Sequence, residues 1–176
     1  MANKIQNFDT GEKDNSNIIH LDLDPKINIE NKIYFKNLLK KIAECSLDDL
    51  EENLENLYHV DAEFNGFHPI NEIKGIEEIK NKYLIPLKKA FPDLERRNNL
   101  VIGGAFRDKV FVSFISHLTG TFTNEWLGVK PTNKTIYLRT CEAHQITNNK
   151  IIKSYTLIDT VDFIRQAGYW PINKSL

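Results

Sequence analysis

Hydrophobic and polar positions alternate with a period of two through much of the C-terminal half of the chain. This period is typical of β-strands that have one buried face. The predicted strands are 94–106, 110–122, 139–146 and 150–159. Two adjacent residues, Asn148 and Asn149, tolerate the positive φ angles of a two-residue turn. We therefore expect the last two strands to form a hairpin.

In the N-terminal half, apolar positions recur every three or four residues, which predicts amphipathic helices. The predicted helices are 31–45, 46–57 and 75–91. Ser46 is expected to act as an N-cap. Pro86 lies inside the third helix and should kink or interrupt it, because proline has no N–H to donate. An aromatic-rich strand, 58–67, is predicted between the second and third helices.

Two or three helices around four or five mostly antiparallel strands make an α+β layer fold. Residues 1–28 are rich in Asn, Asp and Lys and are expected to form a flexible N-terminal arm. Residues 29–176 are expected to form a single domain.

Charge and composition narrow the classes of partner. The chain has 23 basic and 24 acidic side chains and a formal net charge of -1, so a nucleic-acid or anionic-membrane partner has no electrostatic support. No signal peptide and no run of about 18 apolar residues is present, so a cytoplasmic location is the default expectation. Cys45 and Cys141 fit neither a disulfide framework nor a zinc or redox spacing, and are expected to be ordinary buried thiols.

The predicted hairpin brings several chemically active side chains together. If the two Asn residues are the central turn residues, Glu142 lies opposite Tyr155. The same register places His144 opposite Lys153, with Tyr155 and Asp159 on one face. A Glu, a His, a Tyr and an Asp would then line one surface.

Asp159 stands where the strand pattern changes to helical spacing, at Val161 and Ile164. A carboxylate at the mouth of an apolar pocket can accept or donate a proton near neutral pH, so Asp159 is a candidate general acid/base. The alternative is that Asp159 caps the helix that follows it, since aspartate is a preferred N-cap. Capping would stabilise the carboxylate and lower its basicity. Both interpretations remain open at this point.

Three stretches resemble the SnoaL-like polyketide cyclases of the nuclear-transport-factor-2-like superfamily. The stretches are GIEEIKNKYLIPLKKAFPDL, GTFTNEWLGVKPTNKTIYLR and NKIIKSYTLIDTVDFIRQAGYWP, within roughly 38–171. The resemblance implies a cystatin-like cone, in which N-terminal helices wrap a curved antiparallel sheet. It also implies a ligand pocket at the open end and a homodimer formed through the sheet. In the cyclases the acid/base is an aspartate before a segment like LRQLG, and Asp159 before DFIRQAG matches that position.

The chain also departs from the family pattern. Many relatives carry histidine where Phe122 stands, tryptophan where Tyr155 stands and glycine where Asn133 stands. These departures bear on the substrate more than on the fold. The superfamily contains several enzyme classes and proteins without known catalysis, so the fold alone names no reaction.

Further candidate residues follow from the pattern. His144 beside Glu142 would be held in one tautomer and be a better base, although a lone strand histidine is more often structural. His117 and His68 are weaker candidates for the pocket. An aromatic wall that selects an apolar ligand would include Tyr155, Trp126 and Phe64, with plain core packing as the alternative for each. No metal spacing and no nucleotide motif is present, so neither a metal nor another cofactor is expected.

The sequence therefore leads to a cofactor-independent enzyme that moves a proton on a small apolar substrate, by aldol cyclisation, isomerisation or hydrolysis. Two alternatives remain. One is a non-catalytic dimer that binds a hydrophobic small molecule, which Phe122 in place of histidine favours. The other is an assembly module whose exposed sheet binds another protein.

Overall fold

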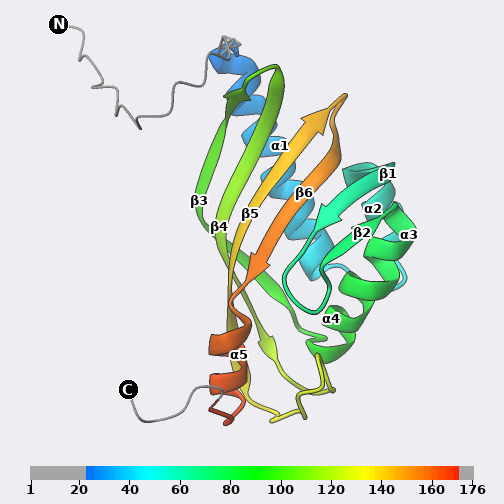
Figure 1. The fold of residues 1–176 in the computed structure, drawn as a ribbon, viewed down its shortest axis with the longest axis vertical. Helices are drawn as coiled ribbons and strands as arrows, with labels where there is room; N and C mark the ends of the chain where they lie inside the picture. The colour runs from blue at the N-terminus through cyan, green and yellow to red at the C-terminus, as the bar shows by residue number, and fades with distance from the viewer. Residues whose placement is uncertain (1–22, 171–176) are drawn as a thin grey trace, which may run out of the picture.

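The protein is a curved six-stranded sheet with helices packed on its concave side, as the computed structural model shows for residues 23–170 (Figure 1). The helices are α1 (Pro25–Glu44), α2 (Leu50–Leu57), α3 (Ile76–Ile79), α4 (Ile85–Ala90) and α5 (Thr160–Gln166), with a π-helical turn, η1 (Lys80–Leu84), between α3 and α4. The strands are β1 (Tyr58–Asn65), β2 (Glu72–Lys74), β3 (Glu95–Phe106), β4 (Lys109–Thr121), β5 (Thr135–Thr147) and β6 (Lys150–Ile158). The predicted α+β class is confirmed.

Helix α1 runs along the long strands and begins earlier than the apolar spacing indicates. Asp24 is its N-cap, with Oδ1 accepting from the Lys26 N–H at 2.7 Å, and Pro25 occupies the first turn, where its missing N–H costs nothing. Residues 25–28, expected to belong to the flexible arm, are thus helical. The remainder of that arm, 1–22, lies outside the described residues.

The expected break at Pro86 is confirmed. The chain leaves α-helical geometry over η1 and resumes it in α4, whose second residue is Pro86. Tyr83 and Leu84 of η1 are buried against the sheet. The interruption therefore places two large side chains on the inner side of the molecule.

The strands follow the order β2-β1-β6-β5-β4-β3. All neighbours are antiparallel except β1 and β6, which run parallel. On β4 the predicted alternation is confirmed, because Val112, Phe114 and Leu118 are buried while Ile115 is 46% exposed.

The hairpin of β5 and β6 turns where predicted but has a different register. Asn148 and Asn149 have φ angles of 50° and 58°, and Thr147 pairs with Lys150. The register then shifts, because Ile146 pairs with Ile151 whereas Gln145 pairs with Lys153. A β-bulge at Ile152 accounts for the extra residue.

This bulge reverses the predicted arrangement of faces. Glu142 lies opposite Thr156, and His144 lies opposite Ser154. The predicted pairing of Glu142 with Tyr155 is therefore wrong, because one inserted residue moves the following side chains of β6 to the other face. Tyr155 is 46% exposed on the outer face, whereas Glu142 and His144 are buried on the inner face.

Aromatic rings fill the end of the molecule next to α5. Phe91 and Phe122 stack with ring centroids 5.2 Å apart, and Phe163 of α5 and Trp126 pack edge-on against them. All four side chains are buried. The position at which many relatives carry histidine is thus part of the core here.

Two smaller expectations meet different outcomes. Cys141 is exposed on the outer face of β5, so the prediction of a buried thiol is wrong for it, while Cys45 is partly buried. Within residues 23–170, no helix is long and apolar enough to cross a membrane.

Candidate functional site

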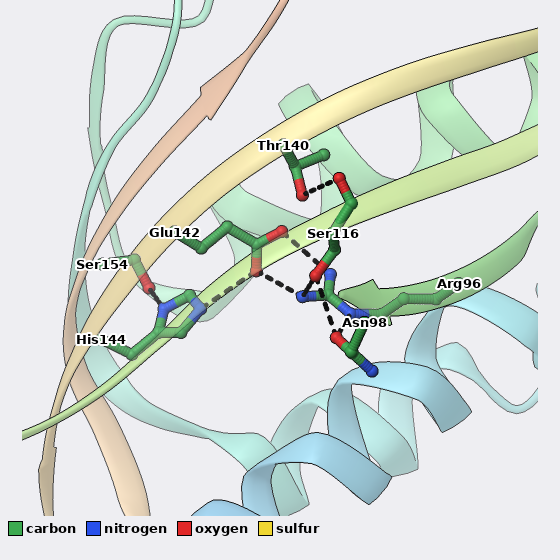
Figure 2. A network of polar contacts seen from close by, with 7 residues as sticks. All are labelled: Arg96, Asn98, Ser116, Thr140, Glu142, His144 and Ser154. Carbon is green, nitrogen blue, oxygen red and sulfur yellow. Dashed lines mark hydrogen bonds and ion pairs between the residues drawn. The ribbon is translucent and has the colours of Figure 1, made fainter. Parts of the chain in front are cut away.

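A buried ion pair lies on the inner face of the sheet. Arg96 of β3 reaches across β4 to Glu142 of β5, with Nη1 donating to Oε1 at 2.9 Å and Nη2 donating to Oε2 at 3.0 Å (Figure 2). Their side chains are only 4% and 5% exposed. The two parallel hydrogen bonds fix both groups, as is typical of arginine with a carboxylate.

Two further donors of Arg96 are also occupied. Its Nε donates to Asn98 Oδ1 at 2.9 Å, and Nη2 donates to Ser116 Oγ at 3.0 Å. The Ser116 hydroxyl in turn donates to Asn98 Oδ1 at 2.9 Å. Strands β3 and β4 therefore hold the guanidinium rigidly in place.

His144 extends this network toward β6. Its Nε2 lies 3.2 Å from Glu142 Oε2, and its Nδ1 lies 2.9 Å from Ser154 Oγ. An ionised carboxylate can only accept, so Nε2 carries the proton and donates to Glu142. In the neutral ring, Nδ1 then accepts from the Ser154 hydroxyl, giving a Ser154–His144–Glu142 relay (Figure 2).

The charges of this network are strongly biased by their surroundings. Burial alone would raise the pKa of Glu142, but Arg96 and His144 outweigh that effect and hold the pKa well below its usual range. Burial raises the pKa of Tyr58, beside Ser154, to about 12. Burial also raises the pKa of Tyr83. Glu142 is thus a permanent anion, and both phenols stay protonated donors.

The network forms one wall of a cavity of about 40 Å³ between the sheet and α1, α2, η1 and α4. Its polar lining is Tyr58, Tyr83, Lys88, Arg96, Glu142, His144 and Thr156. The remaining lining is aliphatic and comes from both layers, for example Leu39 of α1 and Leu118 of β4. A water needs about 10–15 Å³ of such volume, so the cavity has room for only a few small atoms.

Asp159 lies outside this cavity. Its Oδ1 accepts from the Asp162 N–H at 2.9 Å as the N-cap of α5, and its Oδ2 lies 3.0 Å from Arg139 Nη2. The side chains of Asp159 and Arg139 are 37% and 58% exposed. The capping interpretation thus describes the geometry, and a catalytic role of Asp159 stays a prediction.

Loss of this cap has a measurable cost. Asp159→Ala is expected to lower the free energy of unfolding by about 1 kcal/mol, because α5 loses the acceptor for one of its first N–H groups. Asp159→Asn, which can still cap, is expected to lose less. Urea unfolding of both variants checks this, and equal losses would contradict it.

Of the sequence-predicted site residues, the structure brings only Glu142 and His144 together at the cavity. His117 lies on the outer face of β4, where Nδ1 is 2.9 Å from Asn99 Oδ1, and His68 is exposed. Tyr155 is on the outer face as well. Phe64 and Trp126 are buried in the core, away from the cavity lining.

Several residues at the site had no recognisable signal. Arg96 and Lys88 look like surface cations in the sequence, because nothing local shows that each is buried. Ser154 could be placed only by knowing the bulge at Ile152. Tyr58 opens the first predicted strand, and the outward or inward direction of a strand's first residue is not fixed by alternation alone.

No ring of ligands for a metal is formed by the described residues. Within 23–170, no group of three or more His, Cys, Asp or Glu side chains could hold an ion. Glu142 and His144 are committed to Arg96, Ser154 and each other.

These features define a helix-covered, curved-sheet pocket protein, and the sequence profile of the SnoaL-like polyketide cyclases matches residues 36–167. The chain belongs to this family. No curated protein sequence matches it.

Solved structures share the fold. AclR from Streptomyces galilaeus aligns with a TM-score of 0.66 at 19% identity, over 84% of this chain and 87% of that one. A protein of Jannaschia sp. CCS1 classed as a SnoaL-like polyketide cyclase aligns with a TM-score of 0.64 at 16% identity, over 86% of this chain and 99% of that one. A nuclear transport factor 2-like superfamily protein from Salmonella enterica serovar Typhimurium aligns with a TM-score of 0.58 at 12% identity, over 86% of this chain and 95% of that one. The predicted nuclear-transport-factor-2-like fold is confirmed.

Proposed function

We propose that this protein is a cofactor-independent acid/base enzyme of the cyclase or isomerase kind, acting on a small, largely apolar substrate. The observation that carries the proposal is the relay of Ser154, His144 and Glu142, in which His144 and Glu142 line the cavity. A histidine whose other nitrogen donates to a carboxylate is the usual arrangement of a general base.

In this proposal His144 removes a proton from a carbon next to a carbonyl. The proton can reach Nδ1 directly, after the Ser154 hydroxyl rotates away from it. Alternatively, the Ser154 hydroxyl accepts the proton and passes its own to Nδ1. Glu142 stabilises the imidazolium that forms, and Arg96 keeps Glu142 ionised. The protonated phenols of Tyr58 and Tyr83 line the same cavity and are available to donate to the enolate oxygen.

Hydrogen–deuterium exchange tests this without knowledge of the true substrate. The protein is incubated in D₂O with a panel of small ketones and 1,3-diketones, and deuterium at the carbon next to the carbonyl is followed by NMR. The proposal expects exchange above the buffer rate for at least one compound, and loss of that exchange when His144 is replaced. An exchange rate that survives replacement of His144 would remove His144 from the mechanism.

Asp159 remains a competing proposal for the acid/base, supported by its match to the position of the cyclase aspartate. Its cap bond and Arg139 both stabilise the charged carboxylate and so oppose basicity. The same exchange assay on Asp159→Asn separates the two proposals.

The second candidate function is a non-catalytic binder of a small hydrophobic molecule. Phe122 favours it, because it stands where many relatives carry histidine and is buried in the core. The complete pairing of Glu142 and His144 within the protein also favours it. Saturable binding of a compound that the protein never exchanges or converts would support this alternative.

We also propose a homodimer formed through the outer face of the sheet. Leu100, Ile115, Cys141 and Leu157 pair directly across four strands and so form a continuous row on that face. Of these, Leu157 is 62% exposed and Leu100 and Ile115 are each 46% exposed. A patch of this kind on a sheet face is typical of an interface.

Leu157→Lys is expected to convert a dimer of two 20.4-kDa chains into a 20.4-kDa monomer in light scattering at micromolar concentration, because a charge within the interface would be buried unpaired. Ile33→Lys is the matched control, since Ile33 is 56% exposed on α1, away from the sheet's outer face. A wild-type protein that scatters as a monomer would contradict the dimer.

A further inference from the structure

Lys88 of α4 is a buried cation at the cavity wall, and the acid/base proposal gives it no role. The side chain is 7% exposed, and Nζ donates to the backbone carbonyls of Ile42 at 3.0 Å and Ala43 at 2.8 Å. These two bonds use two of the three ammonium protons. Among the described residues no carboxylate forms an ion pair with it.

Lys88 has no direct ion-pair partner among the described residues. Glu142 is neutralised by the bidentate contact with Arg96. Glu44 pairs with Lys40 and accepts from the Arg96 backbone N–H at 3.2 Å. Burial lowers the pKa of Lys88, and the charge of Glu44 opposes that effect without a direct contact between the two side chains.

A buried ammonium that contacts no carboxylate is costly and is stabilised by a counter-ion. The leucines of the lining suit an alkyl group, and the volume of about 40 Å³ admits only a short one. A carboxylate with a short alkyl chain meets both conditions. Its oxygen would accept the third proton of Lys88.

We propose that the cavity is a binding site for short-chain carboxylates, with Lys88 as the residue that binds the carboxylate group. The carboxylate site rests on the proposed function in one respect: if the cavity is the active site, its substrates are organic acids with a short apolar chain. The bond between Lys88 and the end of α1 also has a structural effect, because a cation there stabilises the last helix carbonyls. A structural role alone predicts no affinity for anions.

Titration of the wild-type protein with propionate and with propionamide, followed by NMR shifts of the His144 ring protons, tests the proposal. The two probes have nearly the same shape and differ in charge. We expect propionate to bind at least tenfold more tightly than propionamide. Equal affinities for the two probes would overturn the proposal. The absence of any shift, up to the highest propionate concentration at which the protein stays in solution, would overturn it as well.

Two variants locate the binding group. Lys88→Gln is expected to weaken propionate binding at least tenfold, whereas Lys89→Gln, at the exposed neighbouring lysine, should leave it unchanged. Thermal unfolding shows whether Lys88→Gln is folded, and Lys88→Arg, which keeps the charge, should retain most of the preference for propionate if it folds. Unchanged binding in Lys88→Gln would overturn the role of Lys88.

The carboxylate site and the acid/base proposal fail separately. Propionate binding at Lys88 without deuterium exchange on any ketone would leave the site standing and remove the chemistry. Exchange on neutral ketones without any preference for propionate would retain the chemistry and refute the carboxylate site.

Discussion

Glu142→Gln is expected to lower the free energy of unfolding by about 3–5 kcal/mol, because it leaves Arg96 buried with no charged partner. The Arg96 side chain is only 4% exposed, so bulk water does not replace the lost carboxylate. The loss is measured by urea unfolding monitored through tryptophan fluorescence. A loss below about 1 kcal/mol would show that the pair is hydrated in solution.

The double variant Arg96→Met with Glu142→Leu is the control for this prediction. Replacing both charges by apolar groups of similar volume should recover most of the lost stability, although His144 still loses its acceptor. The pH dependence adds a second readout. The pKa of Glu142 is lowered in the folded state, so its contribution is complete above the pKa of the unfolded chain, about 4.3, and is lost as the pH falls below it. The double variant should lack this acid-dependent loss.

His144→Gln is expected to slow deuterium exchange on a responsive ketone by about 100- to 10,000-fold, the usual contribution of a general base. Glutamine can still donate to Glu142 and bond to Ser154, so the fold should survive. His117→Gln is the matched control, because His117 is on the outer face and bonds only to Asn99 among the described residues. An equal effect of both substitutions would show that the loss is not specific to the cavity.

The fold could be predicted where side-chain periodicity carries the information. The alternation in β4 predicted which residues are buried, and the adjacent Asn148 and Asn149 predicted the turn. The beginning of α1 was missed because its first turn is polar and depends on Asp24 and Pro25 rather than on an apolar stripe.

The candidate site was only partly predictable, because its geometry depends on one inserted residue. The run Ile151-Ile152 has no polar position that would mark a bulge, yet the bulge decides that Ser154 and not Tyr155 shares a face with His144. Arg96 comes from a strand two places away in the sheet from β5, and no local pattern connects it with Glu142. Long-range pairing of this kind exists only in the folded chain.

For Asp159, sequence position alone leaves the role of the side chain open. The residue stands at the strand–helix junction as predicted, but its side chain caps α5 and pairs with Arg139. Phe122 and Phe163 pack edge to face in the buried core at that end of the molecule. The same fold thus places the candidate chemistry at the middle of the sheet.

We propose that the working site is the relay at His144 and not the carboxylate of Asp159. The most direct test is the deuterium-exchange rate of Asp159→Asn, measured beside wild type on the compound that wild type exchanges fastest. We predict that Asp159→Asn retains a rate within about threefold of wild type, since an asparagine cap preserves α5. A fall of Asp159→Asn to the buffer rate, in a protein that remains folded, would contradict the account.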